Sequence, residues 1–131
     1  EPKVRFVADF IGLTNFIEGK VTDVANGSGI GAVDTASGPI RCILPKGSIV
    51  GSNVIIVVRP EDVNLMPAGS GGKNVIEGFV SAAMFMGDAT EFRIALKDST
   101  IRLKLHPSTA VSEGQTIMVE LPEERCRALM G

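Results

Sequence analysis

A run of five β-branched residues near the middle of the chain restricts its fold more than any other feature. Residues 54–58 read Val-Ile-Ile-Val-Val, and Arg59-Pro60-Glu61 follows directly. Such side chains lose χ1 freedom in a helix and pack well on a pleated surface, so the run predicts a strand buried on both faces. Pro60 has no N–H to donate and ends the strand. Arg59 and Glu61 therefore mark the point where a buried strand reaches the surface.

The segments on either side of this run resemble each other. Residues 15–21 (Asn-Phe-Ile-Glu-Gly-Lys-Val) return as residues 74–80 (Asn-Val-Ile-Glu-Gly-Phe-Val), with five of seven positions identical. Two further pairs of similar blocks follow in the same order: 40–44 with 101–105, and 51–55 with 114–118. Both halves then reach a Pro-Glu pair. Chance similarity between strands rich in Ile, Val and Gly is the alternative, but three collinear blocks predict a duplicated β lobe.

Composition limits the classes of function. The chain has 131 residues, a net charge of −2 and no long run of one sign, which does not favour a nucleic-acid or anionic-membrane surface. It has no signal peptide and no apolar stretch of about twenty residues, so we expect a soluble, cytoplasmic protein. Glu1 in place of Met indicates a fragment or a processed product. Cys42 and Cys126 lack metal-ligand spacing and are expected to be buried, reduced thiols.

Turn residues divide the chain into short segments. We expect a short helix at residues 3–11. A second short helix is expected after Pro122, because Glu123 and Glu124 would lie in its first turn. The expected strands are 16–25, 30–35, 40–44, 54–58, 63–66, 74–86 with a bulge at Gly78, 91–97, 100–106 and 115–121. Short strands at this spacing predict an all-β fold with short terminal helices, built as two lobes. Lobe 1 would cover about residues 1–66 and lobe 2 about residues 67–131.

Motifs that suggest catalysis lack the context they need. Residues 27–32 fit the glycine pattern of a dinucleotide-binding loop, but residues 34–39 break the helix that must follow. Residues 69–74 resemble the end of a phosphate-binding loop, yet Asn74 replaces the hydroxyl residue that would hold magnesium. His106 is the single histidine, so neither a zinc site nor a histidine-dependent triad can be assembled. We therefore expect no catalytic residues, no metal and no cofactor.

The order of these segments resembles a known family. Residues 5–16 (Arg-Phe-Val-Ala-Asp-Phe-Ile-Gly-Leu-Thr-Asn-Phe) and 58–63 (Val-Arg-Pro-Glu-Asp-Val) resemble the C-terminal regulatory region of the ATP-hydrolysing subunits of bacterial ABC importers. The spermidine/putrescine, iron(III), maltose and glycerol-phosphate types are the most similar. Residues 87–92, a glycine turn followed by an aromatic residue, fit the second half of that region. The resemblance covers essentially the whole chain.

This resemblance implies two OB-like β-barrel lobes, called the transport-associated OB (TOBE) domain, with no ATPase motifs. It implies as partners the chain's own N-terminal ATPase domain, a second ATPase subunit in a homodimer, the membrane permeases indirectly, and a regulatory protein or ligand. The domain would lie in the cytoplasm, peripheral to the inner membrane. Arg59 and Glu61 carry over from the family's Arg-Pro-Glu element and are expected to be binding residues at a polar junction. A salt bridge that closes the lobe is the alternative role.

Two functions of other classes stay open. One is a small-anion-binding pair of OB-like lobes, as in molybdate-binding proteins. The other is a nucleic-acid-binding OB protein, which would need aromatic platforms in a basic groove. The chain has no Trp or Tyr, and its six Phe residues lie beside apolar residues, which is typical of core packing.

Overall fold

The computed structural model describes residues 14–24 and 27–131, so the helix expected at residues 3–11 lies outside the described part of the chain. Two single-turn 3-10 helices, η1 (Pro60–Asp62) and η2 (Glu123–Arg125), interrupt a succession of strands. The strands are β1 (Asn15–Asp23), β2 (Ile30–Thr35), β3 (Gly38–Ile43), β4 (Asn53–Val58), β5 (Asn64–Met66), β6 (Val75–Phe85), β7 (Thr90–Ala95), β8 (Thr100–Leu105), β9 (Thr116–Glu120) and β10 (Arg127–Met130). The predicted all-β class is confirmed.

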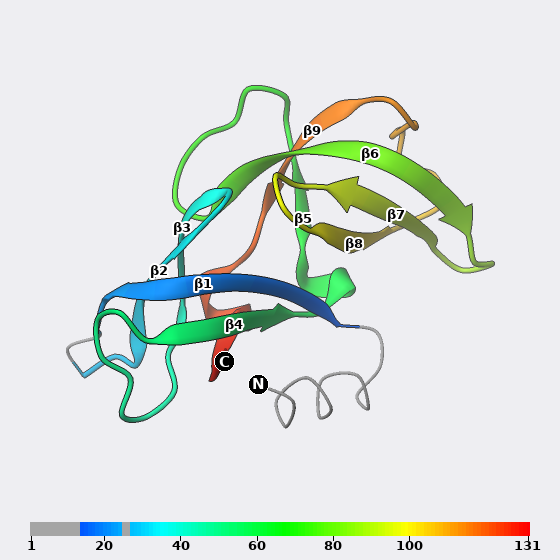
Figure 1. Ribbon diagram of the computed structural model, residues 1–131. Helices are drawn as coiled ribbons and strands as arrows, with labels where there is room; N and C mark the ends of the chain where they lie inside the picture. Colours follow the sequence, from blue (N-terminus) through cyan, green and yellow to red (C-terminus); the bar gives the residue numbers. More distant parts are fainter. Residues whose placement is uncertain (1–13, 25–26) are drawn as a thin grey trace.

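The strands form two curled sheets, one above the other in Figure 1. The lower one is a closed barrel in the order β1-β2-β3-β10-β4, and the upper one is a five-stranded sheet in the order β5-β9-β6-β7-β8. Pairing is antiparallel except between β10 and β3, where Arg127 lies opposite Ile43 in a parallel bridge. That bridge closes the barrel, and the described strands show no equivalent pairing between β5 and β8. Two OB-like lobes are present, and the first is the closed one.

The two lobes exchange their last strands. β5 follows the barrel strands along the chain but pairs with β9 of the second sheet, where Leu65 lies opposite Val119. β10 follows the second-sheet strands but pairs with β4 of the barrel, where Ala128 lies opposite Ile56. Each sheet is therefore completed by a strand from the other repeat. The lobe boundary expected near residue 66 stays a prediction, and strand pairing crosses it in both directions.

Backbone hydrogen bonds show the duplication in detail. In the first repeat, the Val21 N–H donates to Ser52 O at 2.9 Å and the Gly51 N–H donates to Val21 O at 2.8 Å. In the second repeat, the counterparts Val80, Gln115 and Gly114 make the same two bonds at the same two distances, 2.9 and 2.8 Å. The offsets between these positions are those of the sequence blocks. The predicted tandem repeat is confirmed.

The bulge in β6 is not at Gly78 as expected. The register with β7 shifts between Val80 and Ala82, and β1 has the matching shift between Val21 and Asp23. Gly78 serves close packing instead, because a Cβ at this position would overlap Cγ2 of Ile94. A glycine that makes room for a neighbouring strand looks the same in sequence as a bulge glycine.

The predicted central strand is the best-buried part of the barrel. β4 pairs with β1 along one edge and with β10 along the other, and Val54, Ile56 and Val58 are 2%, 0% and 2% exposed. One core cluster includes these residues together with side chains of the second sheet. The two lobes therefore share a hydrophobic core.

The helix expected after Pro122 is wrong beyond its first turn. The chain makes only the 3-10 turn η2 and then continues as β10. Cys126 and Ala128 are buried while Arg127 between them is exposed, which is the alternation of a strand. Pairing with the free edge of β4 outweighs the local helix signals. Among the described residues, no helix has the length and apolar character needed to cross a membrane.

Candidate functional site at the junction of the two repeats

The predicted site residues lie on the first crossover between the lobes. Arg59 ends β4 and Pro60 begins η1, which turns the chain toward the second sheet. Pro60 is buried, whereas Arg59 and Glu61 are exposed on either side of it. Neither side chain has a hydrogen bond or ion pair with another described residue, so the salt bridge considered as their alternative role is not formed within this part of the chain. The two groups face solvent as a cation and an anion beside a rigid turn.

The second crossover has the same backbone geometry but a different sequence register. The Asp62 N–H donates to Arg59 O at 2.9 Å in η1, and the Arg125 N–H donates to Pro122 O at 2.9 Å in η2. Arg59 is thus equivalent to Pro122, and Glu61 to Glu124. The two Pro-Glu pairs that drew attention in the sequence are offset by one residue in the structure.

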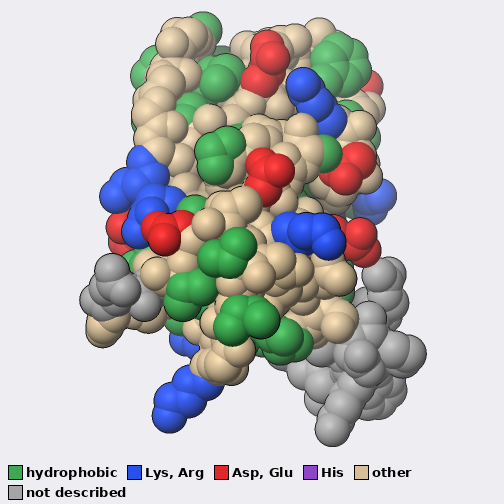
Figure 2. Space-filling model, turned by 60° about the vertical axis from the view of Figure 1, so that its left-hand side comes forward, with side chains coloured by type: hydrophobic (Ala, Val, Ile, Leu, Met, Phe, Trp, Pro, Cys, Tyr) green, Lys and Arg blue, Asp and Glu red, His purple; other side chains and the backbone are tan. Residues whose placement is uncertain are grey.

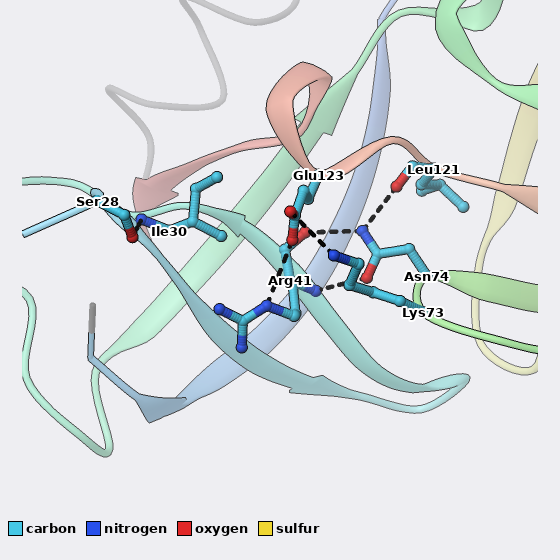
Figure 3. A network of polar contacts seen from close by, with 7 residues as sticks. All are labelled: Ser28, Ile30, Arg41, Lys73, Asn74, Leu121 and Glu123. Carbon is cyan, nitrogen blue, oxygen red and sulfur yellow. Dashed lines mark hydrogen bonds and ion pairs between the residues drawn. The ribbon is translucent and has the colours of Figure 1, made fainter. Parts of the chain in front are cut away.

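A carboxylate on the second crossover connects the two repeats. Glu123 accepts hydrogen bonds from Arg41 Nε at 3.3 Å and from Lys73 Nζ at 3.1 Å, so it lies between a barrel strand and the start of β6 (Figure 3). The Lys73 hydrogen bond is the main cause that lowers the pKa of Glu123 below its ordinary value, with a smaller contribution from Arg41. Because Arg41 and Lys73 are exposed and Glu123 is partly exposed, solvent screens the ion pairs and they add little to stability. Their value is in orienting η2 against β3.

Two buried asparagines join the repeats reciprocally. Asn74, which precedes β6, accepts from the Arg41 N–H at 2.7 Å and donates to Arg41 O at 2.8 Å. Asn15, which begins β1, accepts from the Arg102 N–H at 2.7 Å and donates to Arg102 O at 2.8 Å. Asn74 also donates to Leu121 O at 2.6 Å, just before the second crossover (Figure 3). In each repeat, one asparagine therefore binds a strand of the other repeat through the backbone N–H and C=O of a single arginine.

These asparagines were missed as junction residues in the sequence. Asn15 and Asn74 head the two most similar blocks, and Arg41 and Arg102 occupy the same place in the next pair of blocks. A polar residue kept at the same place in both copies, next to buried β residues, was the available signal. This signal could not show that the partner of each asparagine lies in the other repeat, because that arrangement results from the strand exchange.

Each repeat has one of two equivalent grooves, which lie over Gly19 in the first repeat and over Gly78 in the second. The first, of about 590 Å³, lies over Gly19 and is lined by side chains that include Glu18, Lys20, Asp34 and Asn53. The second, of about 510 Å³, lies over Gly78 and is lined by side chains that include Glu77, Phe79, Leu96 and Lys97. Neither groove gathers the several basic groups that recognise an oxyanion. Their linings differ, so the duplication has not preserved one shared ligand site.

Comparison with known proteins identifies the family of this chain. The family model described as the TOBE domain matches residues 56–129, which is more than half of the chain. The chain belongs to the TOBE domain family. The match begins inside β4 and ends inside β10, so it contains both crossovers.

Curated relatives of this TOBE domain are spermidine/putrescine import ATP-binding proteins. The protein from Rubrobacter xylanophilus is 33% identical over 139 residues, covering 99% of this chain and 35% of the relative. The protein from Ruegeria pomeroyi is 34% identical over 140 residues, covering 98% and 35%. This TOBE domain therefore spans about a third of the length of these relatives.

A solved structure shares the fold of the TOBE domain. The cytoplasmic molybdate-binding protein ModG, solved with molybdate bound, aligns with a TM-score of 0.79 and 16% sequence identity. The alignment covers 89% of this chain and 96% of that one. At this identity, the likeness concerns the arrangement of the two lobes.

The remaining candidate reactive groups of the TOBE domain are two thiols and one histidine. Burial raises the pKa of Cys42 to about 11 and that of Cys126 to about 12, so both remain thiols at neutral pH. Both are free and buried, as expected. His106 is exposed and its Nδ1 lies 2.7 Å from Ser108 Oγ. Across the described residues, no three His, Cys, Asp or Glu side chains are grouped to hold a metal ion.

Proposed function

We propose that this TOBE domain is the regulatory, non-catalytic part of the ATP-binding subunit of a bacterial ABC importer of the spermidine/putrescine type. The observation that carries this proposal is the coverage of the relatives. Several such subunits align with nearly all of this chain, and the chain accounts for about a third of each. The rest of such a subunit would supply the ATPase domain.

In this assembly the domain has four partners: its own ATPase domain, a second subunit of the same kind, the permeases through that pair, and a regulatory protein or ligand. It works in the cytoplasm at the inner face of the membrane. Its two lobes share one core and are tied by Asn15 and Asn74. A force applied to one lobe therefore reaches the other through buried hydrogen bonds and exchanged strands.

We propose that Arg59 and Glu61 contact a partner and so couple this domain to the rest of the transporter. They are exposed, oppositely charged and placed on the crossover that leads from β4 to the second sheet. Pro60 fixes the backbone between them. An ion pair with a partner at such an exposed site is worth about 0–1 kcal/mol, so losing it alters coupling more than folding.

The test uses the full-length subunit reconstituted with its permease in liposomes. Arg59→Ala and Glu61→Ala should leave the domain folded by circular dichroism and ATP binding unchanged, while transport-stimulated ATP hydrolysis or its regulation changes. Arg125→Ala and Glu124→Ala are matched controls, because these exposed residues lie on the equivalent second crossover. Equal stimulation and regulation in all four variants and wild type would show that Arg59 and Glu61 only form a structural corner.

Small-anion binding is the alternative function that the shared fold with ModG leaves to be tested. Isothermal titration with molybdate, sulfate and phosphate tests it. Saturable binding that disappears in Lys73→Ala would support an anion site beside Asn74. We expect no binding, because Glu120, Glu123 and Glu124 line the cavity next to Lys73.

A further inference from the structure

The outer face of β7 and β8 carries two arginines in adjacent positions. The residues of these strands that face the core are at most 2% exposed: Phe92, Ile94, Ile101 and Leu103. Side chains alternate between the two faces of a sheet, so Arg93 and Arg102 point away from the core. The two residues lie directly opposite each other in the register of β7 and β8, which places their Cβ atoms about 5 Å apart. This face therefore holds two guanidinium groups side by side.

Neither arginine has an acidic residue opposite it. Arg93 lies opposite Ala82 of β6 on one side and Arg102 on the other, whereas Lys104 of the same face lies opposite Glu91. Among the described residues, neither arginine forms an ion pair. By contrast, acidic and basic side chains are interspersed on the face drawn in Figure 2, where apolar side chains gather over the lower half. Because like charges opposite each other destabilise a sheet, the fold gains nothing from this arginine pair.

One of the two arginines is already held in position. Arg102 Nη2 donates to Thr14 O at 3.1 Å, and Asn15 binds the backbone of the same arginine. A guanidinium has five N–H groups, so this side-chain contact leaves others for a ligand. Arg93 beside it is exposed. Planar donors of this kind bind a carboxylate through two parallel hydrogen bonds, so the pair is suited to carboxylate groups.

Exposed apolar side chains border the arginine pair on both sides. Phe79 of β6 is 47% exposed and lies opposite Ala95, while Met84 is 49% exposed and lies opposite Glu91. Ala95 and Glu91 are each two positions from Arg93 along β7, in opposite directions, and alternate residues of a strand lie about 7 Å apart. An apolar side chain therefore lies on each side of the arginines. We call the surface formed by Phe79, Met84, Arg93 and Arg102 the arginine face.

We propose that the arginine face binds an acidic segment of a partner protein. The carboxylates of that segment contact Arg93 and Arg102, and its apolar side chains pack on Phe79 and Met84. Charge complementarity selects this partner, because the two guanidinium groups have no acid opposite them within the sheet. Glu91 on the same face repels a continuous phosphate backbone. Phe79 alone gives one stacking platform, whereas single-stranded nucleic acids stack successive bases on several.

Fluorescence polarisation of the whole chain with labelled peptides tests this surface. The probe is the peptide Leu-Glu-Glu-Glu-Leu, and Leu-Gln-Gln-Gln-Leu is its uncharged counterpart. The acidic peptide should bind saturably and more weakly as salt rises, and the uncharged peptide should bind at least about tenfold more weakly. Arg93→Ala should raise the dissociation constant of the acidic peptide about tenfold, as expected for a lost charge-assisted contact.

Arg127→Ala is the matched control for this measurement. Arg127 is an exposed strand arginine of the barrel, but it lies opposite Val57 of β4 and Ile43 of β3, so it has no second arginine beside it. Arg127→Ala should leave the dissociation constant of the acidic peptide unchanged. Met84→Ser should raise it by a smaller factor than Arg93→Ala, because an apolar contact is lost and the charges stay.

A stability measurement separates a binding role of Arg93 from a structural one. Arg93→Thr should move the urea unfolding midpoint to a higher concentration, because it removes the repulsion from Arg102 and places a β-branched residue in a strand. The same variant should bind the acidic peptide about tenfold more weakly. A lower urea midpoint for Arg93→Thr would show that the arginine serves the fold, and it would overturn the proposal.

Four binding results would overturn the proposal as well. They are no saturable binding of the acidic peptide, equal binding of the uncharged peptide, equal losses in Arg127→Ala and Arg93→Ala, and tighter binding of a thymidine oligonucleotide or of phosphatidylglycerol vesicles than of the acidic peptide. The arginine face involves neither Arg59 nor Glu61. Failure here therefore leaves the coupling test at those residues unaffected, and binding at the arginine face would stand even if that test failed.

Discussion

Replacing Asn74 by alanine is the sharpest test of how the two repeats are held together. The Asn74 side chain is 4% exposed and makes three hydrogen bonds, two to Arg41 and one to Leu121. All three partners are backbone groups of other strands or of the second crossover. Alanine would leave these groups without the side chain that now satisfies them.

The expected cost follows from these contacts. At about 1 kcal/mol for each hydrogen bond, the three lost bonds amount to about 3 kcal/mol. Asn74 also has a φ of 60°, where an alanine side chain costs roughly 1–2 kcal/mol. Asn74→Ala should therefore lower the free energy of unfolding by about 4–5 kcal/mol.

Three further variants separate the contributions. Asn74→Gly removes the hydrogen bonds but tolerates the positive φ, so it should cost about 3 kcal/mol. Asn15→Ala removes only the two bonds to Arg102 and should cost about 2 kcal/mol. Asn53 is exposed and its side chain accepts one hydrogen bond, from Lys20, so Asn53→Ala should change stability by less than about 0.5 kcal/mol.

Urea unfolding followed by far-ultraviolet circular dichroism measures all four variants, because the chain has no Trp to serve as a fluorescent probe. The predicted order of destabilisation is Asn74→Ala, Asn74→Gly, Asn15→Ala and then Asn53→Ala. An Asn74→Ala protein within about 0.5 kcal/mol of wild type would refute the reasoning, since a buried group that loses three partners cannot be neutral. A larger loss for Asn15→Ala than for Asn74→Ala would refute it as well.

Three other variants probe the core, a glycine and a thiol. Ile56→Ala, at a fully buried position, should cost roughly 2–5 kcal/mol in urea unfolding, whereas Ile49→Ala, at a position 68% exposed, should cost less than about 0.5 kcal/mol. Gly78→Ala should cost roughly 1–3 kcal/mol because the new methyl overlaps a core side chain, while Gly71→Ala, in open space, should be neutral or slightly stabilising. Folding raises the pKa of Cys126 from 9.0 to about 12, chiefly through burial. The contribution of this thiol to stability is therefore complete below pH 9 and is lost as the pH rises toward 12. In a pH series of unfolding measurements, Cys126→Ala should reduce this loss of stability at alkaline pH.

The candidate site could be only partly predicted. The run at residues 54–58 and the proline after it located the crossover at Arg59 and Glu61, because both signals are local. The reciprocal bonds of Asn15 and Asn74 were not predicted, since their partners are backbone groups in the other repeat. Glu123 was assigned to a helix start, yet its two partners are Arg41 and Lys73. Side-chain type shows that a residue needs a partner, but distant chain segments decide which one it finds.

The sequence by itself determined where most strands and turns occur, with the exception of β10. Residues 30–35 were predicted as a strand and are β2 as observed, and the run predicted at 100–106 is β8 with one residue fewer. β-Branching, alternation of side chains and turn residues act over a few positions, so they are readable without the fold. The duplication was readable for the same reason.

Only the tertiary structure decided which strands meet. β5 and β10 are short and carry weak local signals, and each belongs to the sheet of the other repeat. By sequence, residues 127–130 could form either the end of a helix or a strand. They form a strand because the edge of β4 that they cover belongs to buried residues, whose backbone groups need partners. An unpaired backbone edge in the core costs more than any helix propensity of four residues can return.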